Sequence, residues 1–313
     1  MALMMLLLFA VAVLVPTEAL AWGPITHLAH GSAVLGDLNI APIALQQLLT
    51  QYASEYLYGC IGADITQAKK YTGVLAAHCH SWTVGWQVHA AARTDAQRAF
   101  AWGYLSHLAA DVYSHNHYVP TQLIVSYQTR ALRHVYWETR FDSLQDDKLR
   151  ALLQDLRGRE FHHCDALIEG AVARTLFSFR TNKRIFESIL AWQAFEQWHR
   201  VVRVVDTISR FQLPPEVVDR YNEMCAASIG DLLCRRKRSR SQAADPTGHE
   251  ALTQAMSLRN TLRTLNRARQ ITPALQREID ALALRPEGLR APLSIPALTR
   301  RRAAARDSAR GLG

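Results

Sequence analysis

Histidine and aspartate recur at helical spacing in one segment of this 313-residue chain. In GYLSHLAADVYSHNHYVP, His107, Asp111 and His115 follow one another at intervals of four residues. Side chains at positions i, i+4 and i+8 of an α-helix project from one face. Two imidazoles and a carboxylate are ligands that Zn²⁺ prefers, and the apolar flanks indicate a buried face. The motif therefore predicts a metal site more strongly than a solvated Asp–His pair.

Weaker candidate ligands lie on either side of this helix. His134 and Glu138 also stand four residues apart on a predicted helix, although such a pair alone is common on surfaces. Asp64 follows the stretch YGCIGA, whose two glycines predict a turn that presents the carboxylate from a loop end. Each of these signals gains weight only in combination with the others.

Two positions leave a choice between neighbouring histidines. In the stretch HCHSW, His78 and His80 are both candidates, and we favour His80 slightly because Trp82 can then pack beside it. Downstream of the central helix, His115 keeps the helical face, whereas His117 fits only if the helix unwinds first.

The N-terminus has the pattern of a secretory signal peptide. An apolar run at residues 6–15 precedes Pro16 and the small-residue end Ala-Leu-Ala. The run is about ten residues, too short to span a bilayer comfortably, although an uncleaved anchor is the alternative because no Lys or Arg precedes it. We expect cleavage after Ala21, so that residues 1–21 are removed and the protein is secreted or periplasmic. Trp22 then becomes the first residue, with a free α-amine able to bind a metal ion.

The composition favours an all-α fold. Apolar residues make up 49% of the chain, only 15 residues are Gly, and long Ala/Leu-rich segments show three-to-four spacing. We expect helices at residues 29–52, 95–115, 131–141 and 184–207, with Pro120 ending the central region. One large domain over residues 22–234 is the expected core of the protein.

The positive charge is concentrated after this domain. Residues 235–313 hold 17 Lys/Arg and 6 Asp/Glu, a net of +11, which leaves −2 of the total +9 for residues 1–234. We interpret RRKRSR at 235–240 as a linker, residues 252–283 as helical, and the chain from Arg285 as a mobile tail. The basic segment could attract an anionic membrane surface or simply be solvated; nucleic acid is a weaker partner because no aromatic residue is available for base stacking.

The five cysteines fit no recognisable disulfide framework. Pairs between Cys60 and Cys79, and between Cys225 and Cys234, are both open. The stretch FHHCD at 161–165 is rich in possible metal ligands but does not predict a metal site. Successive residues of a helix point about 100° apart, so these side chains cannot all face one ion.

In their order along the chain, the candidate ligands resemble those of the bacterial zinc-dependent phospholipase C family. That family is an all-α multi-helix bundle that holds up to three zinc ions, and the single-strand-specific zinc nucleases share its architecture. The resemblance rests on motifs over residues 22–140 and on general helical character to about residue 234. The implied ligands are Trp22, His27, Asp64, His78 or His80, His107, Asp111, His115, His134 and Glu138.

The resemblance also implies how these ligands divide among three ions. Trp22, through its amine and carbonyl oxygen, His27 and Asp111 would hold one zinc. Asp64, one of His78 and His80, His107 and a shared oxygen of Asp111 would hold a second, and His115, His134 and Glu138 the third. The spacing departs from the family at one point, because its usual interval of six after the helix aspartate falls on His117.

Such a site predicts phosphodiester hydrolysis by a zinc-activated water. The resemblance gives Asp64 the roles of ligand and general base, and makes phospholipid, cleaved on the glycerol side of phosphate, the expected substrate. Glu138 favours a phospholipase, since the nucleases carry Asp at that point. The alternatives are a single-strand-specific zinc nuclease and a non-catalytic, zinc-stabilised module that binds membranes.

Overall fold

The structure is a computed structural model that describes residues 22–66, 78–129, 134–172, 178–193, 211, 213–284 and 293. Regular structure within these ranges is helical throughout, with no strand, so the all-α prediction is confirmed. The predicted signal peptide, and the predicted tail except for Leu293, lie outside the described residues. Among the described helices, none combines the length and apolar character needed to cross a bilayer.

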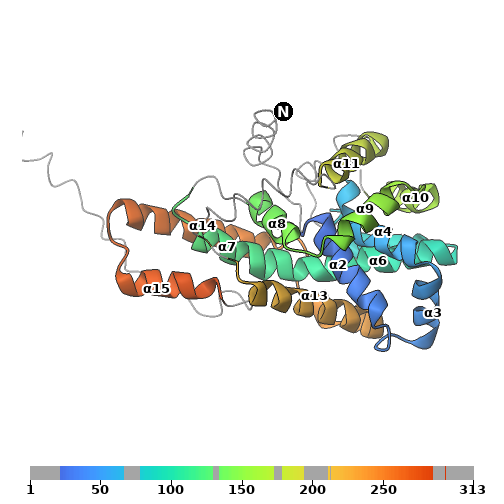
Figure 1. The fold of residues 1–313 in the computed structure, drawn as a ribbon, viewed down its shortest axis with the longest axis horizontal. Coiled ribbons are helices and arrows are strands. Elements are labelled where there is room, and N and C mark those ends of the chain that lie inside the picture. Colours follow the sequence, from blue (N-terminus) through green and yellow to red (C-terminus); the bar gives the residue numbers. More distant parts are fainter. Residues whose placement is uncertain are drawn as a thin grey trace, which may run out of the picture.

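A nearly continuous helical run forms the long axis of the molecule (Figure 1). It consists of α6 (Asp95–Tyr113), the π-turn η4 (Ser114–Tyr118) and α7 (Val119–Val125). A capping box starts it, because the Thr94 hydroxyl accepts the Gln97 N–H and the Gln97 side chain accepts the Thr94 N–H. The expected break at Pro120 is wrong. The π-turn just before this proline widens the backbone where a proline's missing N–H and its ring would otherwise disturb the helix.

Helix α4 (Ala53–Gly62) crosses α6 at very short range, and two glycines make this approach possible. A Cβ on Gly59 would lie 2.1 Å from the Phe100 carbonyl oxygen, and one on Gly103 would lie 2.0 Å from the Tyr56 carbonyl oxygen. Any side chain at these positions would push the two helices apart.

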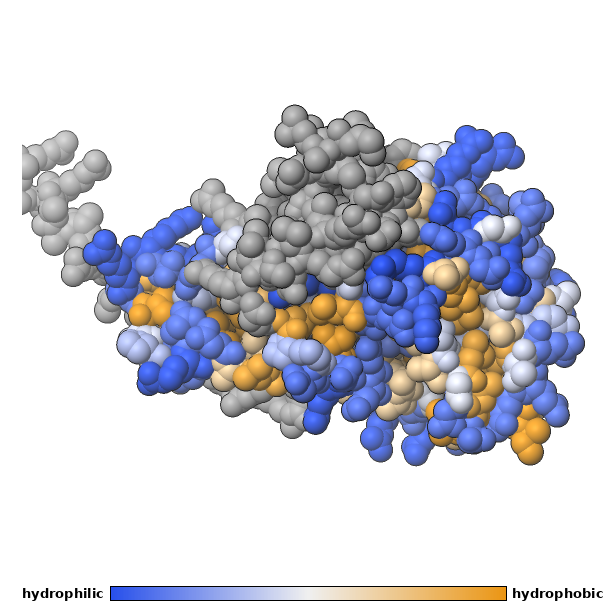
Figure 2. All heavy atoms as spheres, viewed as in Figure 1, coloured by the Kyte–Doolittle hydropathy of each residue, from blue (hydrophilic) through white to orange (hydrophobic). Residues whose placement is uncertain are grey.

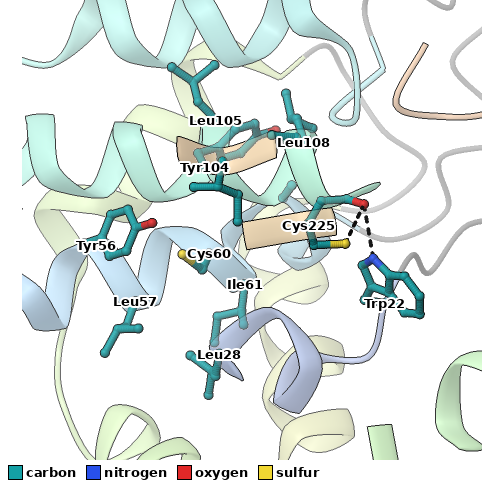
Figure 3. Close-up of a cluster of buried hydrophobic side chains, with 14 of the residues drawn as sticks. Trp22, Leu28, Tyr56, Leu57, Cys60, Ile61, Tyr104, Leu105, Leu108 and Cys225 are labelled. Atoms are coloured by element: carbon teal, nitrogen blue, oxygen red, sulfur yellow. Dashed lines mark hydrogen bonds between the residues drawn. The ribbon is translucent and has the colours of Figure 1, made fainter. Parts of the chain in front are cut away.

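The predicted loop around residues 58–64 is therefore wrong. The glycine-rich stretch is the second half of α4, and its first glycine serves close packing instead of a turn. Asp64 follows directly in the single 3₁₀ turn η1 (Ala63–Ile65). Figure 3 shows Leu57 and Ile61 of α4 on the side of Leu28 of α2, with Tyr104, Leu105 and Leu108 of α6 higher in the view.

The remaining helices surround this pair. They are α2 (Pro24–Gly36), α3 (Ile43–Gln51), α5 (Trp82–Ala91), α8 (His134–Ser143), α9 (Lys148–Arg157), α10 (His162–Ala171), α11 (Phe179–Gln193), α13 (Pro215–Arg235), α14 (His249–Arg267) and α15 (Pro273–Leu282). The single helix expected at 29–52 is wrong, because residues 37–42 separate α2 from α3 and Pro42 is the N-cap of α3. The expected helix at 184–207 is described only as far as Gln193.

The chain after α13 folds back over α5, η4 and α7. Two short turns, η5 (Arg236–Arg238) and η6 (Arg240–Ala243), lead into α14, which packs on α7. We call residues 239–248 the strap. The Trp82 indole N–H donates to the Ala244 carbonyl at 2.9 Å, which ties the strap to α5. The domain boundary at residue 234 stays a prediction.

The described surface is mostly hydrophilic. Figure 2 shows blue side chains over much of the visible described face, with orange apolar groups between them. The most exposed large apolar side chains are Ile43 at 72% and Leu284 at 62%.

Candidate metal centre

Five predicted ligands meet in the interior and form what we call the first cluster. It contains His27 of α2, Asp64 of η1, His80 just before α5, and His107 and Asp111 of α6. All five side chains are buried. Segments up to 84 residues apart in the sequence thus converge on one point.

The Asp111 carboxylate lies at the middle of the first cluster. Its Oδ1 is 3.3 Å from Nε2 of His27, and its Oδ2 is 3.2 Å from Nε2 of His80 and 3.1 Å from Nε2 of His107. On the other side, Asp64 Oδ1 is 3.3 Å from the same His80 nitrogen. One carboxylate therefore faces His27 through one oxygen and both His80 and His107 through the other.

A backbone carbonyl fixes the ring of His107. Its Nδ1 lies 2.8 Å from the Cys60 carbonyl oxygen, and because a carbonyl only accepts, Nδ1 carries the proton. In the neutral ring, Nε2 then presents a lone pair toward Asp111. The same Nε2 lies 2.9 Å from Nε2 of His80, so that lone pairs and carboxylate oxygens face a common centre.

Buried polar atoms without hydrogen-bond partners mark the same place. His27 Nε2 and both carboxylate oxygens of Asp111 are shielded from solvent and form no hydrogen bond. Leaving such groups unsatisfied costs about 1–3 kcal/mol each, and more for charged groups. A divalent cation would satisfy all three, and imidazole nitrogen with carboxylate oxygen is a donor set that Zn²⁺ accepts. The residues present therefore fit the metal.

The electrostatics agree with this fit. Burial, followed by the nearby His107, lowers the pKa of His27, so this imidazole is neutral. Burial alone would raise the pKa of Asp111, but His107 and His27 outweigh it and hold that pKa well below its usual range. Neutral imidazole and ionised carboxylate are the forms that bind metals. For His107, burial acts to lower the pKa, but Asp111 and Asp64 outweigh it and hold that pKa above its usual value, so metal binding competes with a proton there.

A second cluster lies beside the first and contains His115, His134 and Glu138. Glu138 Oε1 is 2.5 Å from Nε2 of His134 and 4.0 Å from Nε2 of His115. The π-turn η4 carries His115, and α8 carries the other two. The His80 and His115 ring centres are 6.5 Å apart, so the two clusters are neighbours.

The geometry separates the alternatives that the sequence leaves open. His80 lies in the first cluster, whereas His78 is grouped only with Cys79 and His80, and its Nδ1 accepts the His80 backbone N–H at 3.1 Å. His115 lies in the second cluster, while the ring of His117 lies 5.5 Å from that of Tyr113 and belongs to none of the metal-sized groups found in the described part of the chain. The ligand roles themselves stay predictions.

Trp22 is anchored beside the first cluster. Its indole N–H donates to the carbonyl oxygen of Ala110 at 3.1 Å, and Ala110 is the residue just before Asp111. The Cys225 thiol approaches the same oxygen at 3.8 Å (Figure 3). Its ring stacks on Tyr118 and packs against Phe141. The side chain thus fixes where the predicted mature N-terminus begins.

Asp142 is a supporting residue that sequence reasoning missed. Helix α2 has Gly23 as its N-cap and no capping side chain of its own. The Asp142 carboxylate, from α8, accepts the Thr26 backbone N–H at 2.7 Å and its hydroxyl at 2.9 Å. It therefore caps α2 from a distance, and no local motif announces a cap supplied by another helix.

Of the five cysteines, Cys79 lies in a metal-sized group with His78 and His80, and the others lie in no such group within the described ranges. All five are thiols in the structure, so neither of the two pairings left open by the sequence is formed. Burial raises the pKa of Cys60 to about 12 and that of Cys225 well above its usual range. These two thiols stay protonated at neutral pH, which disfavours thiolate as a nucleophile or ligand.

These observations define a protein whose described residues are all-helical and that has two adjacent, largely buried groups of imidazoles and carboxylates that could hold metal ions, which is the constitution of a zinc hydrolase. The family model described as zinc-dependent phospholipase C matches residues 25–197, more than half of the chain. The chain belongs to that family. Searches among curated proteins and solved structures found no match. Both clusters lie within the matched range, whereas Trp22 and the strap lie outside it.

Proposed function

We propose that this protein is a secreted zinc phosphodiesterase that cleaves phospholipids on the glycerol side of phosphate. The observation that carries the proposal is the position of Asp111, with one oxygen toward His27 and the other toward His80 and His107. A carboxylate in this position can be shared by two cations. Membership of the phospholipase C family supports phospholipid as the substrate class.

Three zinc ions would divide the ligands as the family resemblance implies. His27 and Asp111 would hold one ion together with the amine and carbonyl oxygen of Trp22. The second would be held by Asp64, His80, His107 and Asp111, and the third by His115, His134 and Glu138. Each of these sets contains imidazole nitrogen and carboxylate oxygen, as zinc prefers.

The bound ions would supply Lewis acidity and a nucleophilic water at neutral pH. Asp64 is the chain's own acid–base group in this scheme, since its Oδ1 points to the His80 edge of the first cluster. It would accept the proton of the attacking water. The new bond joins water oxygen to phosphorus, the phosphorus–glycerol oxygen bond breaks, and the leaving oxygen takes a proton. The products are diacylglycerol and a phosphorylated headgroup.

Removal of the signal peptide would then be a step of site assembly. A free α-amine at Trp22 exists only after cleavage behind Ala21. The buried indole and its bond to the Ala110 carbonyl support a fixed position for this residue. Secretion and processing together would keep the precursor from completing its first metal position.

The exposed basic residues at the end of α13 and in η5 are a proposed membrane contact. Arg235, Arg236, Lys237 and Arg238 are exposed, and Lys237 Nζ lies 5.3 Å from the ring centre of Trp86. Each basic residue near an anionic surface contributes roughly 1 kcal/mol of attraction. Sedimentation with vesicles with and without phosphatidylserine tests this contact, and equal binding to both would contradict it.

The central experiment combines metal analysis with two substrates. Protein beginning at Trp22 is assayed for zinc content and for hydrolysis of phosphatidylcholine and of single-stranded DNA. We expect up to three zinc ions per chain and phosphatidylcholine hydrolysis. Activity on DNA alone would overturn the phospholipase in favour of the related nuclease.

The variant Asp64→Asn separates an enzyme from a binding module. We expect it to lose hydrolysis, whereas Asp219→Asn, an exposed change on α13, should leave activity unchanged. If wild-type protein binds zinc and vesicles but neither substrate is cleaved, the non-catalytic module is the correct function.

A further inference from the structure

The strap crosses the molecule next to the second cluster and is held there by several bonds. Besides Trp82, which binds the Ala244 carbonyl, the Trp86 indole N–H donates to the Gln242 side chain at 3.0 Å. From the π-turn, the Asn116 side-chain amide donates to the Asp245 carbonyl at 2.8 Å. These bonds tie the strap to α5 and to η4, two elements that flank the clusters.

The strap touches His115 directly at two points. The Pro246 carbonyl oxygen lies 2.6 Å from Nδ1 of His115. Gly248, with a left-handed φ of +57°, lies so close that a Cβ there would be 2.4 Å from both the Cβ and the carbonyl oxygen of His115. Only glycine permits this approach, because any other residue would meet both the strained φ and the His115 backbone.

The contact determines which nitrogen of His115 can bind a cation. A carbonyl only accepts, so Nδ1 carries the proton, and in the neutral ring Nε2 is left with its lone pair on the Glu138 side. A hydrogen bond from the second ring nitrogen is the usual means by which a metal-binding histidine is oriented. His107 receives the same support from the Cys60 carbonyl, but that carbonyl belongs to a neighbouring helix within the family match.

We propose that the strap is a positioning element for the second cluster. Through the Pro246 carbonyl and the Gly248 contact it holds His115 in the ring orientation and tautomer that bind the third zinc ion. The strap lies beyond residue 197, where the family match ends, so the family model does not account for this role. The inference rests on the proposed function, because it concerns one of the three proposed zinc positions.

The test compares two glycine-to-alanine variants. Gly248→Ala forces the strap away from His115, whereas Gly170→Ala adds the same methyl group on α10, where nothing lies within 4 Å. Zinc affinity is measured by chelator competition on folded protein beginning at Trp22. We expect Gly248→Ala to weaken one zinc position by about 10–100-fold and to leave the other two unchanged. Gly170→Ala should keep all three.

A second variant adds no atoms near His115. Trp82→Phe combined with Asn116→Ala removes two of the bonds that anchor the strap but keeps its glycine. We expect the same zinc position to weaken, by less than in Gly248→Ala. This variant decides the question if circular dichroism shows that Gly248→Ala does not fold. Nitrogen-15 NMR of the histidine rings gives a second readout, the loss of the Nδ1-protonated signal of His115.

The outcomes separate this proposal from the proposed function. Unchanged affinity at all three positions in folded Gly248→Ala, or in the double variant if that protein does not fold, overturns the positioning role and leaves the enzyme intact. Weakening of all positions equally also overturns it, because the strap would then act on general stability. Wild-type protein that binds no zinc overturns both.

Discussion

The two clusters use the same ligand types but are held in different ways. The first lies where α2, η1 and α6 meet, next to the crossing of α4 and α6 that Gly59 and Gly103 permit. The second joins a π-turn to α8, and its His115 is bonded to the carbonyl of Pro246, 131 residues further along the chain. The first cluster is thus part of the helical core, whereas the second depends on a segment laid over it. Damage to the first should therefore affect folding and metal binding together, and damage to the second mainly the affinity for one ion.

Substitution of Asp111 should have the largest effect and tests whether the first cluster is a unit. In Asp111→Asn the side chain keeps its size but loses the charge that faces three imidazoles. We expect two zinc positions to be lost and phosphatidylcholine hydrolysis to fall by about 10³-fold, since bound metal contributes several kcal/mol to the transition state. The second cluster should keep its ion.

Metal analysis and initial rates check this expectation. Asp95→Asn, an exposed change at the start of the same helix, is the matched control and should retain zinc and activity. Loss of all three ions would show that the clusters are not independent, and an unchanged zinc content would show that Asp111 is not a shared ligand.

Adding a methyl group at the α4–α6 crossing should damage the first cluster through the fold. In Gly103→Ala the new Cβ would sit 2.0 Å from a backbone oxygen, which cannot rotate away. We expect the free energy of unfolding to fall by about 1–3 kcal/mol or more, measured by urea denaturation. Gly36→Ala, at the end of α2 with nothing within 4 Å, should change stability little. Equal stability of the two variants would mean that the helices can separate without cost.

The helix pairs in the two clusters were predictable because side-chain type and helical spacing are local properties, whereas His27 and His80 were expected only from the family resemblance. His107 and Asp111, like His134 and Glu138, are spaced one turn apart, so the sequence alone places each pair on one face. The ordered set then identifies the family, which the match over residues 25–197 supports.

The supports of the clusters were not predictable, because they are backbone groups or distant side chains. The Pro246 carbonyl, the Asp142 cap and the close contact at Gly59 leave no pattern in their own neighbourhood. The glycine in particular suggested a turn, since a glycine that allows close packing and one that allows a turn look alike in sequence.

A single extra residue at the N-terminus should weaken the first cluster without touching the second. If alanine precedes Trp22, the amine becomes a peptide nitrogen, which is a poor ligand. We expect the zinc affinity of one position to fall about tenfold, as it does when a group that orients a metal ligand is removed. Chelator competition measures it, with alanine added after Gly313 as the control. Unchanged affinity would mean that the first cluster is complete without the N-terminus.

The smallest expected effect comes from His30, which joins α2 to α13 near the first cluster. Its Nε2 lies 3.0 Å from the Asn222 side-chain oxygen, and burial, followed by the nearby His27, lowers its pKa to about 3. Below pH 6.5, His30 is protonated in the unfolded chain, whereas in the folded protein it stays neutral until the pH falls to about 3. The contribution of His30 to the free energy of unfolding is therefore complete above pH 6.5 and is lost progressively as the pH falls toward 3.

For this one group the loss at pH 6.0 is about 0.8 kcal/mol. Urea denaturation of chelator-treated protein at pH 8.0 and pH 6.0 measures it, and His30→Gln should lose less stability than wild type over this interval by that amount. Gln47→Ala, an exposed change on α3 that adds or removes no titratable group, should follow the wild-type curve. Parallel curves for wild type and His30→Gln would show that the folded protein accepts the proton. The packing of α2 against α13 at His30 would then be less tight than the burial of His30 implies. The first cluster would also be less clearly the more rigid of the two.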